Sequence, residues 1–246
     1  MNHDAGRFRA LMTIDTRSVR RDSMLRWMVV VPVILALITR YALPAIDARL
    51  TERFDFDLAP YYPLVLSFLI LMVPQFFGLV MGFLLLDQRD DQTLETLQVT
   101  PLSPGQLVAY RLAVPVALSV PMTVIVLALA GVLPFEWPAV AAGALGGALF
   151  APCYALVLAT FASNKVQGFA LAKATGILVM PAIAAWFVPL PWQFLVGIVP
   201  TYWPLKAYWI LQAGHPHGWI YVLIAVAYFG GLMLWLSRRF DRRIRS

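Results

Sequence analysis

Six long apolar segments limit what this 246-residue chain can fold into. A run of about 20 mainly apolar residues is long enough to cross a bilayer as a helix. The chain is 61% hydrophobic and 13% charged, whereas soluble domains average about 45–50% apolar and about 25% charged residues. We therefore expect an all-α integral membrane protein in which residues 1–246 form one transmembrane domain. The six predicted spans cover residues 24–46, 61–86, 106–133, 138–161, 168–188 and 219–236.

A dense polar block, residues 87–104, interrupts the apolar pattern between the second and third predicted spans. Asp87, Asp91 and Glu95 recur every four residues, so a helix carries them on one face. Pro101 ends that helix, because proline disfavours the α conformation in the residue before it. The block is therefore predicted to leave the membrane as a compact helical segment. An amphipathic surface helix without a partner is the structural alternative.

The stretch from Leu86 to Ser103 resembles the cytoplasmic coupling segment of type-2 ATP-binding-cassette (ABC) transporter permeases, most closely the small drug- or fluoroquinolone-exporter-like permeases. An acidic, Arg-containing entry leads to Thr-Leu-Glu-x-Leu-x-Val-Thr-Pro-Leu-Ser at residues 93–103. Many relatives have Gly where this chain has Gln92, so the chain departs from the pattern there. The resemblance implies that the segment docks a separate cytoplasmic ATPase subunit. The residues it implies for this coupling are Asp87, Arg89, Asp90, Asp91, Thr93, Leu94, Glu95, Leu97, Thr100 and Pro101.

The amino-terminal residues 1–23 are basic, with apolar side chains on one helical face and arginines on the other. This pattern predicts a helix that lies in the inner membrane interface. A signal peptide is the alternative, but the charged part is long and no clean Ala-x-Ala site follows it. The family resemblance also implies an amino-terminal interfacial helix.

Residues 189–214 are too apolar for a free loop and too interrupted by proline for one straight span. Two short half-helices that dip into the outer leaflet, with aromatic side chains at the interface, fit this composition. The resemblance implies an outer re-entrant helical hairpin here. An ordinary aromatic surface loop is the alternative.

Two features within the spans bear on packing and function. Gly143 and Gly147 form a Gly-x-x-x-Gly pair, which permits close contact between helices. We expect that contact within one chain rather than between chains. Lys173 is expected to extend toward the inner interface, and the alternative is a buried functional lysine.

The 19 lysines and arginines are distributed unevenly about the predicted spans. Six spans place both termini on one side, together with fifteen of these residues; Arg40, Arg49, Arg53 and Lys206 fall on the other. An excess of basic residues marks the cytoplasmic side. Both termini and the 87–104 block are therefore predicted to be cytoplasmic, in a bacterial-type cell membrane. The block itself is acidic, which suits a protein partner better than anionic lipid.

Several kinds of chemistry have no matching pattern in the sequence. There is no Gly-x-x-x-x-Gly-Lys-Ser/Thr phosphate loop, so no cofactor is expected in this chain, and ATP and Mg would bind the partner ATPase. The single Cys153 excludes an intrachain disulfide. His215 and His217 lack a third ligand type nearby, so no metal site is predicted. No catalytic arrangement is visible, and a non-catalytic transmembrane subunit is expected.

No carboxylate lies deep in a predicted span, which argues against an ion-coupled secondary carrier. The favoured function is an ABC exporter permease that pairs with a second permease chain, identical or paralogous. It would move an amphiphilic small molecule or lipid out of the cell. A secondary carrier and a non-transporting membrane scaffold are the alternatives. The predicted substrate path is apolar and aromatic, although ordinary helix packing explains the same side chains: Gln75, Phe76, Phe77, Trp186 and Phe187.

Overall fold

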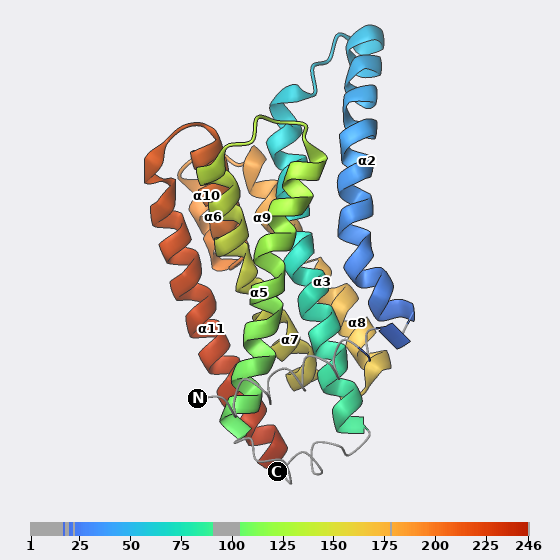
Figure 1. Ribbon diagram of the computed structural model, residues 1–246. Helices are drawn as coiled ribbons and strands as arrows, with labels where there is room; N and C mark the ends of the chain where they lie inside the picture. The colour runs from blue at the N-terminus through green and yellow to red at the C-terminus, as the bar shows by residue number, and fades with distance from the viewer. Residues whose placement is uncertain (1–16, 18–19, 22, 91–103, 178, 246) are drawn as a thin grey trace, which may run out of the picture.

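The computed structural model describes residues 17, 20–21, 23–90, 104–177 and 179–245. Throughout these residues the regular structure is helical (Figure 1). Six helical segments are long and apolar enough to cross a membrane, which confirms the predicted number of spans. They are Leu25–Phe54, Ala59–Asp87, Leu112–Ala130, Trp137–Phe161, Lys165–Phe187 and Pro216–Arg239. The predicted interfacial helix at 1–23 falls almost entirely outside the described residues.

Long α-helices form the first, second, third and sixth spans, while shorter helices form the rest. The long helices are α2 (Ser23–Phe54), α3 (Tyr62–Asp90), α5 (Pro104–Ala130) and α11 (Trp219–Arg245). The shorter ones are α6 (Trp137–Ala148), α7 (Phe150–Phe161), α8 (Lys165–Gly176), α9 (Val179–Ala184) and α10 (Tyr202–Gln212). Short 3₁₀ turns are η1 (Ala59–Tyr61), η2 (Ala185–Phe187), η3 (Trp192–Ile198) and η4 (Pro216–Gly218).

The first helix is longer than expected, because residues 47–54 continue it instead of forming a charged loop. The residue that follows this helix, Asp55, is left-handed, with φ of 50°. Asn and Asp tolerate this conformation better than most residues. Asp47 then holds the connection: its carboxylate accepts hydrogen bonds from the Leu58 amide and the Tyr62 hydroxyl, both at 2.8 Å. The helix outlasts the predicted span of 24–46 because membrane thickness limits the length of the apolar run but not the length of the helix.

The fourth and fifth spans are broken, although the sequence predicts each as one segment. Leu149 separates α6 from α7, and Pro152 then lies in the first turn of α7, where a missing N–H costs little. The fifth span divides into α8, α9 and η2, and Pro181 lies within α9. By contrast, α3 runs unbroken through Pro74.

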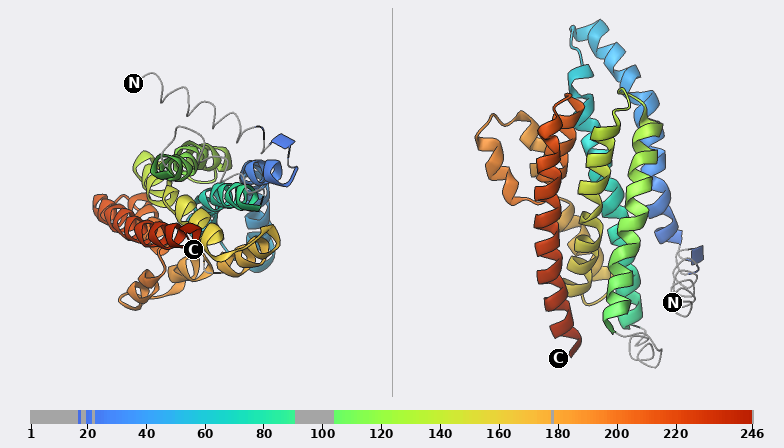
Figure 2. Two further views of the ribbon diagram at one scale, coloured as in Figure 1. Left: turned by 90° about the horizontal axis from the view of Figure 1, so that it is seen from below. Right: turned by 60° about the vertical axis from the view of Figure 1, so that its left-hand side comes forward.

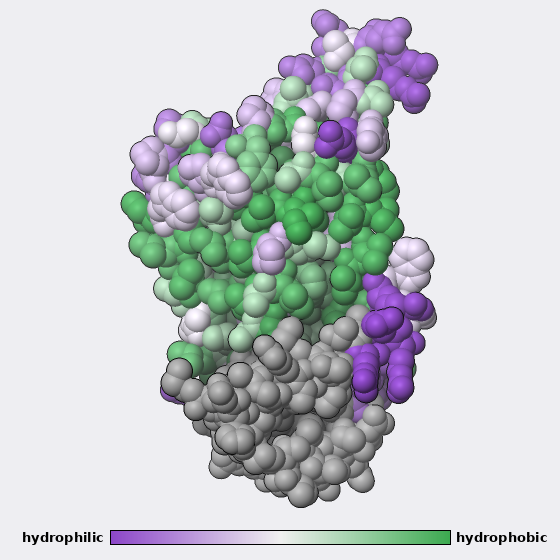
Figure 3. Space-filling model, viewed as in Figure 1, coloured by the Kyte–Doolittle hydropathy of each residue, from purple (hydrophilic) through white to green (hydrophobic). Residues whose placement is uncertain are grey.

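Helix α3 is the centre of the bundle. It packs against α2, α5, α7 and α8, which surround it in the view along the helices (Figure 2, left). The second and fourth spans are the most buried of the six. The surface in Figure 3 shows an apolar belt with hydrophilic residues toward both ends of the described part. This distribution is the one that a membrane-spanning bundle requires.

Glycines allow α3 to approach its neighbours closely. A Cβ added to Gly78 would lie 2.4 Å from the Ala151 carbonyl oxygen on α7. One at Gly82 would lie 2.7 Å from a methyl carbon of Leu158. This Gly-x-x-x-Gly pair on α3 was missed in the sequence. The predicted pair on α6 also makes its contact within the chain, against Ile70 of α3, as expected.

Candidate functional site

The predicted coupling segment 87–104 connects α3 to α5 at one end of the bundle (Figures 1 and 2). Pro104 is the first residue of α5, a position that suits proline because its missing N–H has no intrahelical partner there. Arg89 and Asp90 belong to the last turn of α3, where the structure describes their backbone alone. Seven of the ten predicted coupling residues lie outside the described residues: Asp91, Thr93, Leu94, Glu95, Leu97, Thr100 and Pro101.

Asp87, the first acid of that segment, is tied to the fifth span. Its carboxylate lies 2.8 Å from the Lys165 ammonium in the first turn of α8, and each side chain is about one-third exposed (36% and 32%). Such exposed pairs contribute about 0–1 kcal/mol, so the contact fixes position more than it adds stability. Asn164 caps the same turn by accepting a hydrogen bond from the Gln167 amide at 3.0 Å. The start of α8 is therefore held beside the end of α3.

The carboxyl-terminal helix reaches the same end of the bundle. The guanidinium of Arg239 on α11 lies 5.1 Å from the centre of the Phe161 ring, at the end of α7, and 5.6 Å from that of Trp235. Cations over aromatic rings at these distances are attracted to them. The fourth and sixth spans are thus joined near the coupling segment.

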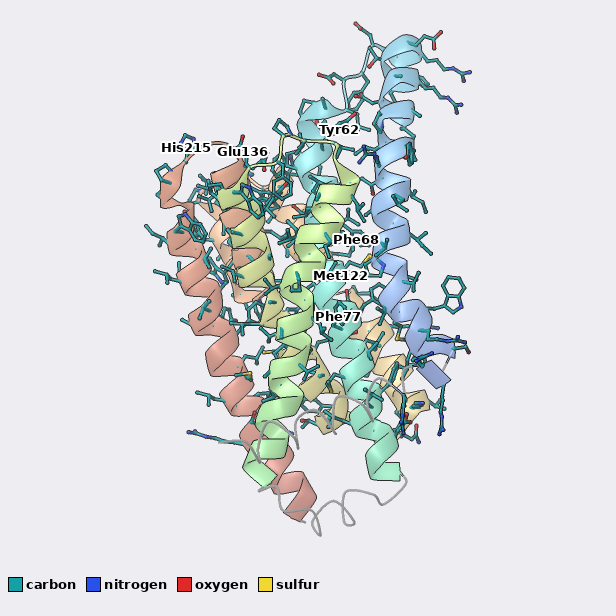
Figure 4. The ribbon with its side chains drawn as sticks, in the orientation of Figure 1. Tyr62, Phe68, Phe77, Met122, Glu136 and His215 are labelled. Carbon is teal, nitrogen blue, oxygen red and sulfur yellow. The ribbon has the colours of Figure 1, made fainter. Side chains whose placement is uncertain are left out.

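The five predicted path residues do not gather on one surface of the single chain. Phe77 is buried in the main core, about halfway along α3 (Figure 4), while Phe76 packs against a different cluster nearer the coupling end. The Gln75 amide nitrogen lies beside Gly176 of α8. Trp186 packs edge-on against Trp209, and Phe187 stacks on Tyr61, with ring centres 5.1 Å and 6.0 Å apart. Their part in a substrate path stays a prediction.

The 189–214 segment contains two short helices, η3 and α10, as its composition predicts. Helix α10 packs against α6 and α11, and most of its side chains are buried. The Trp209 indole donates a hydrogen bond of 2.6 Å to the Ser67 hydroxyl, which fixes α10 to α3. Such burial does not fit the alternative of an aromatic surface loop. Re-entry from the outer leaflet stays a prediction.

A buried polar cluster, which sequence reasoning missed, joins η3 to α10. We call Gln193, Tyr202 and Lys206 the Gln193 cluster. The Gln193 amide oxygen accepts hydrogen bonds from the Tyr202 hydroxyl at 3.1 Å and the Lys206 ammonium at 2.5 Å. Its amide nitrogen donates to the carbonyls of Ala185 and Val188, at 2.8 and 3.2 Å. Gln193 therefore links α10 to the carboxyl end of the fifth span.

Burial changes the acid–base behaviour of this cluster. Lys206 is 7% exposed, and loss of solvation lowers the pKa of its ammonium below the usual value. Burial also raises the pKa of the Tyr202 hydroxyl to about 12. The spacing of Tyr202 and Lys206, four residues apart in an apolar segment, was the available signal. From the sequence alone, Lys206 counted only as one of the four basic residues on the outer side.

The structure also places three other ionisable side chains that the sequence analysis singled out. Lys173 is exposed on α8, so the alternative of a buried functional lysine is wrong. His215 and His217 stack with ring centres 5.5 Å apart at the exposed α10–α11 connection. Within the part of the chain that the structure describes, no three His, Cys, Asp or Glu side chains are arranged to hold a metal ion.

Comparison with known proteins identifies relatives along almost the whole chain. Residues 15–237 match the family model described as fluoroquinolones export permease protein Rv2686c-like. Fluoroquinolones export permease protein Rv2686c of Mycobacterium tuberculosis (strain ATCC 25618 / H37Rv) is 32% identical over 230 residues, which cover 92% of this chain and 90% of that protein. Fluoroquinolones export permease protein MT2760 of strain CDC 1551 / Oshkosh gives the same values. With six apolar spans and a match over most of its length, the chain belongs to the Rv2686c-like family of fluoroquinolones export permeases.

Proposed function

We propose that this protein is the transmembrane subunit of an ABC exporter, driven by ATP that a separate subunit hydrolyses. Membership of an export permease family supports the transport role. The absence of a phosphate-loop sequence supports a separate ATPase. By analogy with the names of its relatives, the exported molecule is an amphiphilic aromatic drug of the fluoroquinolone kind. An apolar bundle with few charges suits such a molecule better than a sugar or an ion.

The orientation follows from charge. Fifteen of the 19 lysines and arginines belong to the end that carries both termini and the 87–104 segment. Positive residues are enriched on the cytoplasmic side, so this end faces the cytosol of a bacterial-type cell. The acidic 87–104 segment is then accessible to a soluble ATPase. The opposite end, with Glu136 and His215 (Figure 4), faces outward.

The central place of α3 carries the mechanical part of the proposal. It is continuous from Tyr62 to Asp90, so its last turn leads directly into the coupling segment. It also packs against α2, α5, α7 and α8. A displacement of the coupling segment would therefore be transmitted to most of the bundle through the rigid helix α3. The Asp87–Lys165 pair extends the same displacement to the fifth span. A second permease chain, identical or paralogous, completes the path.

The coupling role is tested by reversing charge on the segment. Asp91→Lys with Glu95→Lys should abolish co-purification of the ATPase and ATP-dependent efflux, while the permease still inserts. Leu94→Asp should do the same by removing an apolar docking contact. Glu136→Lys is the control, because it makes one such acid-to-lysine change on an exposed residue at the other end.

Normal efflux by the charge-reversed variant, with the ATPase still bound, contradicts this docking role. Efflux from liposomes that contain the permease alone, driven by an ion gradient, would instead favour the secondary carrier. A protein that supports neither kind of transport, yet assembles with membrane partners, would favour the scaffold.

A further inference from the structure

We propose that Lys206 binds the carboxylate of the exported molecule, an inference that rests on the function proposed above. Among residues whose burial the structure describes, Lys206 is the buried side chain that carries a formal charge. It belongs to α10, outside the six spans, in the half of the bundle that faces outward under the proposed orientation. A buried charge is costly unless it is paired, so this lysine requires a reason to be present.

The hydrogen bonds of the Gln193 cluster leave Lys206 incompletely satisfied. The Gln193 amide makes four hydrogen bonds: two through its oxygen and two through its nitrogen. Its capacity is therefore filled. A lysine ammonium has three N–H donors, and Lys206 uses one of them, toward Gln193, within the described chain. Two donors of a buried cation remain for a ligand.

No negative charge from the described residues compensates Lys206. The ion pair seen among the described residues joins Asp87 to Lys165, which lie at the opposite end of the bundle from Lys206. The ammonium donates a hydrogen bond to the neutral Gln193 amide. The Tyr202 hydroxyl, which is also neutral, donates to the same amide oxygen. A carboxylate would supply both the missing charge and two acceptor oxygens, so it matches the unused donors.

The surroundings of Lys206 suit the rest of a flat aromatic anion. Tyr202, Lys206 and Trp209 lie on one face of α10, at positions i, i+4 and i+7. The Trp209 ring packs edge-on against Trp186 of η2, one of the predicted path residues. The fluoroquinolones named for the relatives carry one carboxylate on a flat aromatic ring system. Lys206 would hold that carboxylate while the indoles contact the rings.

Burial of Lys206 in this conformation agrees with a binding role in a transporter. Alternating access exposes a site in one state and covers it in another. The Gln193 amide then acts as a stand-in acceptor when no substrate is bound. A lysine with a purely structural role would hold the η3–α10 junction whether or not the substrate carries a carboxylate. Substrates with and without a carboxylate therefore distinguish the two roles.

The test compares ciprofloxacin with its methyl ester, which keeps the ring system but lacks the carboxylate. Binding is measured by drug fluorescence at pH 7, with the full-length chain in lipid nanodiscs. The native protein should bind the acid at least about tenfold more tightly than the ester, because the ester cannot form the charge-assisted pair. Lys206→Gln should remove this preference, and Lys206→Arg should retain it. Lys173→Gln, which removes an exposed lysine, is the matched control and should behave like the native protein.

Equal binding of the two compounds by the native protein overturns the assignment, and this comparison needs no variant to fold. A preference for the acid that persists in Lys206→Gln overturns it too. If the native exporter with its ATPase pumps both compounds without preference, the inference about Lys206 fails alone. If neither compound binds, the drug-export function fails with it.

Discussion

Gln193 shows how much one side chain organises the outward half of this bundle. Its amide closes the carboxyl end of the fifth span by donating to Ala185 and Val188, and accepts hydrogen bonds from two side chains of α10. Backbone carbonyls at a helix end need such donors, because no intrahelical partner exists there. The same amide oxygen accepts a hydrogen bond from the buried Lys206 ammonium. Local structure and a candidate binding group therefore depend on one residue.

At the residue scale, Lys206 makes a prediction about pH. Because burial lowers the pKa of its ammonium, the unfolded chain binds more protons at this group than the folded chain over a window. That window runs from the lowered pKa of the folded state up to the unfolded value of about 10.4. The free energy of unfolding should therefore rise with pH across it, relative to Lys206→Met. Tyr202 stays protonated throughout, since its pKa is about 12.

The measurement is the difference in thermal unfolding midpoint between the native protein and Lys206→Met in detergent, between pH 7 and pH 10. The unfolding midpoint of the native protein should rise relative to that of the variant as pH increases. Lys173→Met, at an exposed lysine, should show no such trend. A flat difference for Lys206→Met would mean that the ammonium is solvated, against its observed burial.

At the scale of elements, the bundle depends on how closely α3 approaches α7. Gly78 lies opposite the Ala151 backbone, where an added Cβ would come within 2.4 Å of a carbonyl oxygen. A backbone atom cannot move aside as the end of a flexible side chain can. The two helices must then separate, and the packing along their whole contact suffers.

Gly78→Ala should therefore lower the free energy of unfolding by about 1–3 kcal/mol, the usual cost of forcing extra volume into a packed interior. Gly230→Ala on α11 is the control, because nothing lies within 4 Å of the added carbon. There, alanine should be neutral or stabilise the helix by up to about 1 kcal/mol. Thermal unfolding of both variants in detergent provides the comparison. Equal midpoints would show that α3 and α7 are not held as closely as described.

At the scale of the whole molecule, the six spans divide the connections between two ends. The α8 start, with Val166, belongs to the end of the coupling segment, and the α10–α11 connection, with His217, belongs to the other. Both residues are exposed, while the native Cys153 is buried. Each position can therefore carry a cysteine that reports its own side of the membrane.

A membrane-impermeant maleimide added to intact cells should label His217→Cys and leave Val166→Cys unlabelled until the cells are opened. This outcome follows from the excess of basic residues at the coupling end. The native chain, with its one buried cysteine, measures the background. Labelling of Val166→Cys in intact cells would place the coupling segment outside and remove any access for an ATPase.

The sequence by itself determined the all-α membrane class, the six spans and the division of charge between their ends. These properties depend on the length and composition of single segments, which the bilayer selects directly. The match of the chain to an export permease family agrees with the resemblance seen at residues 86–103. The start of α5 at Pro104 also agrees with a local rule, because proline suits the first position of a helix.

Only the tertiary structure decided which residues meet. The contact of Gly78 with Ala151, the pair of Asp87 with Lys165 and the Gln193 cluster each join separate elements. The residue periodicity of one segment does not predict these contacts, because they depend on how the helices pack against one another. Lys206 illustrates the difference: the sequence shows a cation near an aromatic stretch, and the fold buries it with one neutral acceptor. That incomplete pairing, a property of the assembled bundle, makes it a candidate for substrate binding.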